Sequence, residues 1–477
     1  MLKNKQIIIK YLLFLLIAIS IILLFSKATS PLYDGSYSVD DSIFKVIGKG
    51  ILNGYVPYKD LFDHKGPILF LIQALGLLIN KNVGIFILQI LNLFVTIIYM
   101  DKIIELLLLN KKNKKIIFFL ATIFFGIYMG EGNLSEEWSI ALITIQLYIK
   151  CKMMSKDKNY SKYYFITGII FSTISLIRLN NAATSVGFIT YIFFYFIVRK
   201  DIKELLKMCG WFVLGCFLVY FPIFVWFYKV EAIPEMIYGT LTFNFIYSAS
   251  TNINSNYIIM IINKVILILP LIVLLIEVKA SSFESEYKKC FYSIIFWNAV
   301  AVSVGYAYLH YYMILVPLFI ILIILLFNSK PKEKKNKKII NIVKYVIIIY
   351  ISIIYLLYVF MGIIYMFQKN LNVETARVIL DDVEEIKEIV KNEKEILCYD
   401  TPARIYLLLD KMPSCKYFTM QEWHSMHDSN INKQLEDFLT NGNIEYIITY
   451  KNFEKEWLSN YKLIYNNHKY NLYKLRK

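Results

Sequence analysis

Long apolar runs separated by short polar segments fill the first three quarters of the chain. Eleven of these runs predict membrane-spanning helices. They are residues 7–25, 83–108, 116–130, 136–150, 163–177, 182–198, 208–228, 257–278, 290–308, 312–327 and 339–367. The apolar run 67–80 has about fourteen residues, which is short for a span and favours an interfacial or re-entrant helix.

The pattern changes at about residue 368, where charged residues become frequent and short alternating runs replace the long apolar ones. This part predicts a small α/β domain over residues 368–477. Its predicted strands are 396–399, 444–449, 462–465 and 470–475. Its predicted helices are 374–391 and 432–439. The predicted fold class is therefore an all-α polytopic membrane protein over residues 1–367, with about 11 transmembrane helices, followed by this domain.

Composition agrees with that class. Of the 477 residues, 57% are hydrophobic, and the mean hydropathy is +0.51, which is too apolar for a soluble globular protein. The formal net charge is +16. The lysines form short clusters between apolar runs, a pattern that orients a membrane protein, so nucleic acid is not a predicted partner.

The lysine clusters also predict which side each segment faces. If the run 67–80 does not cross, the predicted cytoplasmic segments hold 25 Lys and Arg residues, whereas the opposite loops 130–135 and 309–311 hold none. We therefore expect a multi-pass plasma-membrane protein with a cytoplasmic N-terminus and an extracytoplasmic C-terminal domain. The run 7–25 lacks a small-residue cleavage site, so we expect an uncleaved first helix.

With this topology, ionisable side chains gather at the outer boundary of the membrane. The first external loop, residues 26–82, carries Asp40, Asp41, Asp63, His64 and Lys65. Three further connections add Glu136, Glu137, Arg178, His310 and Tyr311. Ionisable residues at membrane depth are functional candidates. The alternative is that these loops are simply polar and that Lys65 and Arg178 extend to lipid head groups.

The first loop resembles that of the GT-C glycosyltransferases, which include protein O-mannosyltransferases and the aminoarabinose transferases of lipid A. The resemblance rests on an acid pair after the first helix, an amphipathic stretch, and a lysine before a proline that opens a short helix. The family's Asp-Glu pair matches Asp40 and Asp41, and its lysine matches Lys65 in the sequence HKGP. Glu136 stands where the family usually has a second aspartate.

The resemblance implies a membrane enzyme that moves a sugar from a polyprenyl-phosphate donor to an acceptor hydroxyl on the outer face, with inversion. Asp40 would take the proton of the hydroxyl, with Asp41 and Glu136 as the other catalytic candidates. Lys65 and Arg178 would stabilise the departing phosphate. The remaining candidates for substrate binding are Asp63, His64, Glu137, His310 and Tyr311. No cofactor is expected, since no His or Cys spacing predicts a metal site, although Asp40 and Glu136 could share a metal.

Two other functions are open to a chain of this kind. A transporter or flippase of lipid-linked glycans should show charges or broken helices near the midplane, often in two related halves. This chain has nearly uncharged span centres and no similarity between its halves, which favours the enzyme. A scaffold that displays the C-terminal domain would leave the first loop unexplained. Cys398 and Cys415 are the two cysteines of that domain, and two free buried thiols are favoured over a disulfide.

Cysteine labelling tests the predicted topology. In a variant without the native cysteines, a cysteine at position 81 should react with an impermeant maleimide in intact cells. A cysteine at position 112 should react only after permeabilisation, because the positive-inside rule puts residues 110–115 in the cytoplasm. The reverse result would overturn both the topology and the outer-face site.

Overall fold

The computed structural model describes residues 2–33, 39–154, 160–249, 257–304, 308–328, 353, 382–441 and 444–476. These residues belong to two compact units, which are described separately. The first unit comprises Met1–Ser26, Phe86–Phe224 and Asn252–Ile363, and the second comprises Lys27–Ile85, Val225–Thr251 and Ile364–Lys477. The predicted span 339–367 lies outside the described residues except for position 353, and the predicted domain boundary at 367 and 368 lies outside them entirely.

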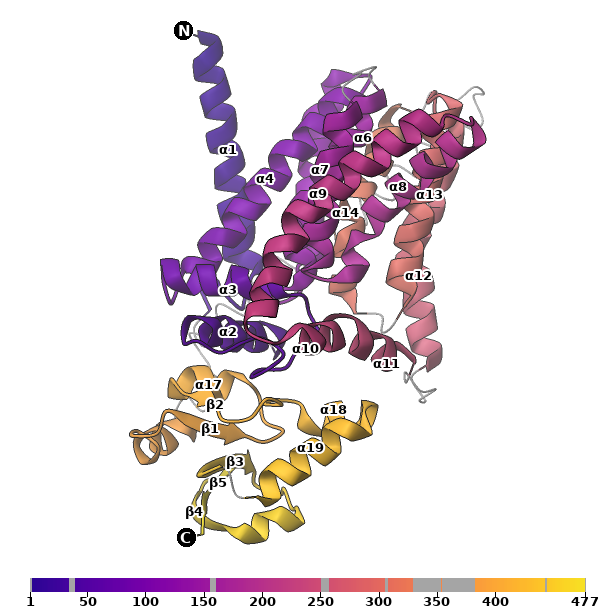
Figure 1. Cartoon of the computed structure of the whole chain (residues 1–477). Helices are drawn as coiled ribbons and strands as arrows, with labels where there is room; N and C mark the ends of the chain where they lie inside the picture. Colours follow the sequence, from indigo (N-terminus) through magenta and orange to yellow (C-terminus); the bar gives the residue numbers. More distant parts are fainter. Residues whose placement is uncertain are drawn as a thin grey trace. The chain divides into compact units, whose positions relative to one another are not determined.

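The first unit is helical (Figure 1). Its helices are α1 (Leu2–Phe25), α4 (Gly84–Leu107), η1 (Lys111–Asn113), α5 (Lys114–Tyr128), α6 (Ser135–Met154), α7 (Tyr160–Ser175), η2 (Leu179–Ala182), α8 (Ala183–Val198), α9 (Ile202–Lys229), α12 (Tyr257–Ala280), α13 (Ser285–Ser303), η4 (Leu309–Leu315) and α14 (Val316–Asn328). Helices α4 and α9 each continue for a few residues in the second unit. These helices confirm that the ten predicted runs between residues 7 and 327 are mainly helical.

Five helical segments among the described residues are long and apolar enough to cross a membrane. They are Lys5–Phe25, Gly84–Leu107, Leu179–Val198, Ile202–Lys229 and Leu309–Asn328. The count of about eleven spans stays a prediction. The short apolar run that was predicted at 67–80 is a separate helix, α3 (Pro67–Ile79).

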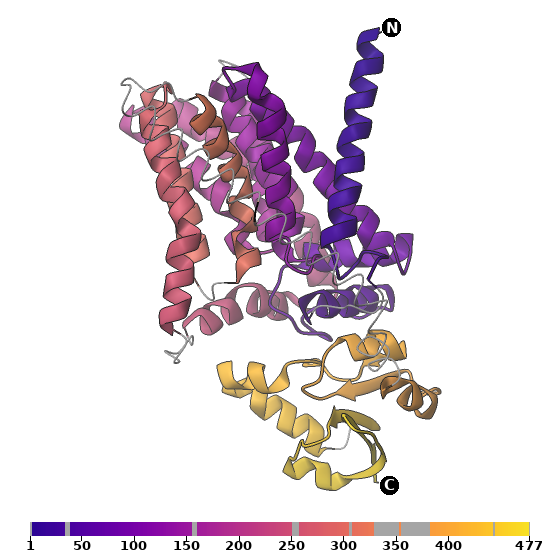
Figure 2. The ribbon, with the colours of Figure 1, turned by 180° about the vertical axis from the view of Figure 1, so that it is seen from behind.

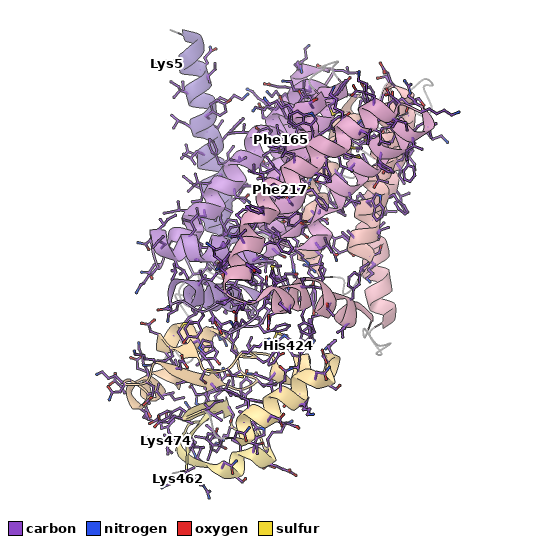
Figure 3. The ribbon with its side chains drawn as sticks, viewed as in Figure 1. Lys5, Phe165, Phe217, His424, Lys462 and Lys474 are labelled. Atoms are coloured by element: carbon purple, nitrogen blue, oxygen red, sulfur yellow. The ribbon has the colours of Figure 1, made fainter. Side chains whose placement is uncertain are left out.

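Helices of the first unit pack closely where small residues face each other. A Cβ atom on Gly168 of α7 would lie 2.1 Å from the carbonyl oxygen of Phe212, and one on Gly215 of α9 would lie 2.1 Å from that of Phe165. The two glycines therefore let the backbones of α7 and α9 touch, as small residues do between membrane helices. Away from this contact, α9 exposes large apolar side chains such as Phe217, labelled in Figure 3, which suits a surface that faces lipid.

The second unit combines the first loop, a short helical segment and the C-terminal domain. Its helices are α2 (Val39–Leu52), α3, α10 (Ile233–Ile237), the π-helical turn η3 (Tyr238–Thr242), α11 (Phe243–Ala249), α17 (Arg404–Leu409), α18 (Gln421–His427), α19 (Ser429–Thr440) and η5 (Glu456–Asn460). Its strands are β1 (Glu395–Cys398), β2 (Met412–Pro413), β3 (Tyr446–Tyr450), β4 (Tyr461–Asn466) and β5 (Tyr470–Leu475). Figure 2 shows α2 beside α3 from the back.

Helix α2 is amphipathic, with one apolar face that is buried and one polar face. Its apolar side chains, including the fully buried Phe44 and Ile47, give it a hydrophobic face. The polar positions Asp41, Lys45 and Lys49 recur every four residues and therefore share another face. That polar stripe carries part of the candidate site.

The C-terminal domain is a five-stranded sheet in the order β2-β1-β3-β5-β4. Strand β1 pairs in parallel with β2 and β3, whereas β5 is antiparallel to β3 and β4. Helix α19 buries Ile431, Leu435 and Leu439 in the same core as Leu397 and Ile447 of the sheet. The Asp428 side chain caps this helix by accepting a hydrogen bond from the amide of Asn430.

This architecture confirms the small α/β domain that was predicted. The four predicted strands lie within two residues of β1, β3, β4 and β5, and the helix predicted at 432–439 is α19. Of the helix predicted at 374–391, residues 382–391 are described; residues 382–389 are helical, and 390–391 form a turn. The pattern did not reveal β2, α17 or α18, which are only two to seven residues long. Cys398 and Cys415 are free and buried.

Candidate active site

The acid pair in the first turn of α2 separates into two different environments. Asp41 is fully buried, and its carboxylate lies 3.0 Å from the ammonium of Lys45, one turn further along the helix. Asp40 is partly exposed and makes no hydrogen bond or ion pair with any described residue. The carboxylate of Asp40 is therefore available to a substrate, whereas that of Asp41 is held in the fold.

Lys45 connects Asp41 to the start of the first loop. Its ammonium donates to the carbonyl oxygen of Ala28 over 2.8 Å, and Lys45 as a whole is only 8% exposed. Removing a charge from water costs several kcal/mol unless a partner offsets it, so the buried lysine and Asp41 depend on each other. No role was predicted for Lys45, although its four-residue spacing from Asp41 is typical of an ion pair on one helix.

Lys65 is buried immediately before helix α3. Gly66 and Pro67 open this helix, as expected for proline at a first helical position. The hydroxyl of Tyr58 donates to the carbonyl oxygen of Lys65 over 2.6 Å. Tyr58 is itself fully buried and has a φ angle of 69°, a backbone conformation that a tyrosine adopts only when its surroundings hold it there. The loop thus fixes the backbone at Lys65, and sequence reasoning missed Tyr58.

Asp63, His64 and Lys65 form a chain of polar contacts. The Lys65 ammonium lies 2.7 Å from Nε2 of His64, and Nδ1 of His64 lies 3.2 Å from Asp63. Burial by itself would raise the pKa of Asp63, but the Lys65 charge and the charge and hydrogen bonds of His64 outweigh it and hold this pKa well below its usual range. The sequence therefore placed three candidates side by side, and the structure joins their side chains.

An aromatic cluster beside this chain was not predicted. Phe62 lies at its centre, with ring centroids 5.3 Å from Phe243, 5.2 Å from Tyr417 and 5.4 Å from His424. His424, labelled in Figure 3, is 4% exposed, and burial lowers its pKa to about 3, so its ring is neutral. Trp423 stacks at a tilt near His64, with 6.1 Å between the ring centroids. The C-terminal domain thus supplies part of the surroundings of His64.

In the first unit, Glu136 and Arg178 form a buried ion pair. Glu136 is 2% exposed, accepts a hydrogen bond from the Arg178 guanidinium, and also accepts one from the Ser135 hydroxyl at 3.0 Å. The guanidinium carbon of Arg178 lies 4.1 Å from the ring centroid of Tyr311, a cation–π contact. The ring of His310 packs edge-on against Tyr311, with 4.7 Å between centroids. Four predicted site residues are therefore in one cluster.

Glu137 is held by a different set of donors. Gln89 donates to both of its carboxylate oxygens, at 2.8 and 2.9 Å, and the amide of Asn133 donates at 2.7 Å. The loop before α6 can turn here because Gly132 has a φ of +87° and approaches Ser26 so closely that a Cβ atom would lie 2.1 Å from its hydroxyl oxygen. Gln89 was missed because it stands alone in an apolar run.

The candidates therefore divide between the two units. Asp40, Asp41, Asp63, His64 and Lys65 belong to the second unit, whereas Glu136, Glu137, Arg178, His310 and Tyr311 belong to the first. Over the part of the chain that is described, no three His, Cys, Asp or Glu side chains come together in a way that would hold a metal ion. The expectation of a metal-free enzyme stays a prediction.

Solved structures that are similar to this chain include two near full-length matches. ArnT from Cupriavidus metallidurans bound to undecaprenyl phosphate has a TM-score of 0.58 and 10% sequence identity, with 97% of each chain covered. ArnT from Cupriavidus metallidurans in the apo state has a TM-score of 0.54 and 9% identity, with 99% of this chain and 98% of that chain covered. No protein-family profile and no curated protein sequence matches the chain.

This chain has the fold of ArnT. The resemblance to GT-C glycosyltransferases is thus confirmed at the level of the fold, including the C-terminal domain, because the alignment covers nearly the whole of both chains. At about a tenth identity, the likeness says nothing about individual side chains. The roles of the residues in this ArnT-like fold depend on their own geometry.

The unequal environments of Asp40 and Asp41 predict unequal effects on stability. Asp41→Asn should lower the free energy of unfolding by about 3 kcal/mol, because it leaves the buried Lys45 ammonium without its counter-charge. Asp40→Asn should change it by less than about 0.5 kcal/mol, as at most surface positions. Thermal unfolding of the purified variants in detergent measures both. Equal destabilisation would contradict the assignment of Asp41 to a structural ion pair.

Proposed function

We propose that the protein is a plasma-membrane glycosyltransferase that moves a sugar from a polyprenyl-phosphate donor to an acceptor hydroxyl on the outer face. One observation carries the proposal: the near full-length likeness to ArnT, an aminoarabinose transferase that has been solved with undecaprenyl phosphate bound. The partly exposed carboxylate of Asp40 and the buried cation of Lys65, on neighbouring elements of one unit, support it.

The reaction requires a base near the acceptor hydroxyl. In the proposed step the hydroxyl oxygen bonds to the anomeric carbon of the sugar while its proton moves to the Asp40 carboxylate. The bond between that carbon and the phosphate oxygen breaks, and the electron pair leaves with the polyprenyl phosphate. A single displacement of this kind inverts the anomeric centre. Asp41 contributes by holding the first turn of α2 through Lys45.

The departing phosphate gains negative charge, and a preformed cation lowers the energy of that state. Lys65 suits this role because its backbone is fixed by Tyr58 and by the start of α3, so little reorganisation is needed during the reaction. The same role is proposed for Arg178, with Glu136 orienting its guanidinium through their ion pair. Since Glu136 already accepts from Arg178, we assign it a supporting role rather than that of the base.

Asp40→Asn tests the proposed base. The amide keeps the size of the side chain but cannot take the proton, so transfer from a polyprenyl-phosphate sugar should fall by about 10²–10⁴-fold. Donor binding and protein yield should be nearly unchanged. Transfer rates of purified protein with a radiolabelled donor give the answer, and Asp60→Asn in the same loop is the matched control. Activity within about threefold of wild type would exclude Asp40 as the base.

Lys65→Ala tests the proposed phosphate contact. Loss of a charged hydrogen bond should weaken binding of undecaprenyl phosphate by about tenfold or more. Lys59→Ala is the control, since Lys59 lies in the same loop but is exposed and donates to the carbonyl oxygen of Val230. Binding is measured by titration of each protein in nanodiscs. Equal weakening in the two variants would favour a general attraction of loop lysines to head groups instead.

A further inference from the structure

Lys65, the proposed phosphate contact, has one hydrogen-bonding partner for its ammonium among the residues that the structure describes. That partner is Nε2 of His64, which lies 2.7 Å away. Lys65 is only 6% exposed, so water cannot freely replace a partner that is lost. The direction in which the ammonium points therefore depends on the position of the His64 ring.

The chemistry of this contact also places the proton of the imidazole. An ammonium has only N–H donors, so Nε2 of His64 is the acceptor and carries no proton. The single proton of the neutral ring is then on Nδ1, which lies 3.2 Å from a carboxylate oxygen of Asp63. The ring thus turns its proton toward the acid and its lone pair toward Lys65.

The backbone of His64 is held by the segment that contains the π-helical turn η3. The side-chain amide of Asn244 donates to the carbonyl oxygen of His64 over 2.8 Å, and also to two carbonyl oxygens of the turn itself. A Cβ atom on Gly239 would lie 2.6 Å from the ring of Tyr58 and 3.1 Å from the carbonyl oxygen of Asp63, so a glycine is needed for this close approach. Turns of this kind are frequent at functional sites.

Aromatic rings lie beside the imidazole. The centroid of the His64 ring is 5.9 Å from that of Phe243 in α11 and 6.1 Å from that of Trp423 in α18. The helical segment and the C-terminal domain therefore both border this ring. With its backbone held by Asn244 and its sides packed, His64 meets the requirement that a group which orients a reactive side chain must itself be fixed.

We infer that His64 is a positioning residue for Lys65. Its Nε2 accepts one hydrogen bond from the ammonium and so directs the other N–H donors of Lys65 toward the phosphate of the donor. Asp63 acts one step further away, because its negative charge favours the ring proton on Nδ1. This inference rests on the proposed function, in which Lys65 contacts the phosphate, and it places His64 outside the reacting atoms.

Two amide substitutions at position 64 separate the roles of the two ring nitrogens. In His64→Gln the amide oxygen is the same number of bonds from the backbone as Nε2, so it can still accept from Lys65. In His64→Asn the shorter side chain brings its oxygen only as far as Nδ1 and leaves the ammonium without an acceptor. Both variants lose the ring and its packing, so a role limited to packing would give equal losses.

The dissociation constant of undecaprenyl phosphate is measured for the full-length variants in nanodiscs. His64→Gln should bind within about threefold of wild type, whereas His64→Asn should bind about tenfold or more weakly, because a buried charged donor loses its partner. In a Lys65→Ala background, His64→Asn should cause no further loss, since the two residues act through one contact. Equal losses in the two amide variants, or an additive loss in that background, would overturn the inference.

A measurement on the ring itself needs no ligand. The chain has five histidines, so NMR of protein with isotopically labelled histidine, compared with His64→Gln, identifies the His64 signals. Nδ1 should carry the proton at neutral pH, and Lys65→Ala should shift the Nε2 signal. A neutral ring protonated at Nε2 would overturn the inference whatever the binding data show. The expected tautomer together with unchanged undecaprenyl phosphate binding in Lys65→Ala would support the pairing and overturn the proposed phosphate contact.

Discussion

A carboxylate that leaves water needs a cation or several donors, and this cost determines which acids of this protein remain available for chemistry. Asp41 meets Lys45, Glu136 meets Arg178, and Glu137 receives three hydrogen bonds from Gln89 and the amide of Asn133. The contacts of Glu136 with Arg178 and of Glu137 with Gln89 each join two segments of the first unit, whereas Asp41 and Lys45 lie in one helix, α2. The buried charges thus stabilise the scaffold, and Asp40 differs from them because it remains partly exposed.

The C-terminal domain and the first loop belong to one compact unit, which gives the domain a structural part in the candidate site. The amide of Phe62 donates to the carbonyl oxygen of Lys416, and the Phe62 ring packs against His424. Phe62 precedes Asp63, His64 and Lys65 directly, so these contacts restrict the same loop that presents Lys65. If the chain were only a scaffold that displays this domain, the domain would not need these contacts with the first loop.

The likeness to ArnT at about a tenth sequence identity illustrates how little of a membrane fold depends on particular side chains. Helices of the right length and apolar surface, joined by polar loops, meet the demands of the bilayer with many sequences. A reaction depends more strongly on particular side chains than the fold does, because a base or a cation must lie at a given place. The features specific to this chain are therefore in its loops: Asp40 beside a paired Asp41, and His64 between Asp63 and Lys65.

Hydropathy alone predicted the helical runs, the short helix before residue 80 and the α/β domain, since apolar length and periodicity are local properties. It also located the polar loop that contains Asp40 and Lys65. It could not predict that Tyr58 would fix Lys65, that Gln89 would hold Glu137, or that His424 would be buried. Those outcomes join residues 7, 48 and 362 positions apart. Contacts over such separations arise only when packing removes side chains from water, so the tertiary structure decided which polar groups are paired and which remain free.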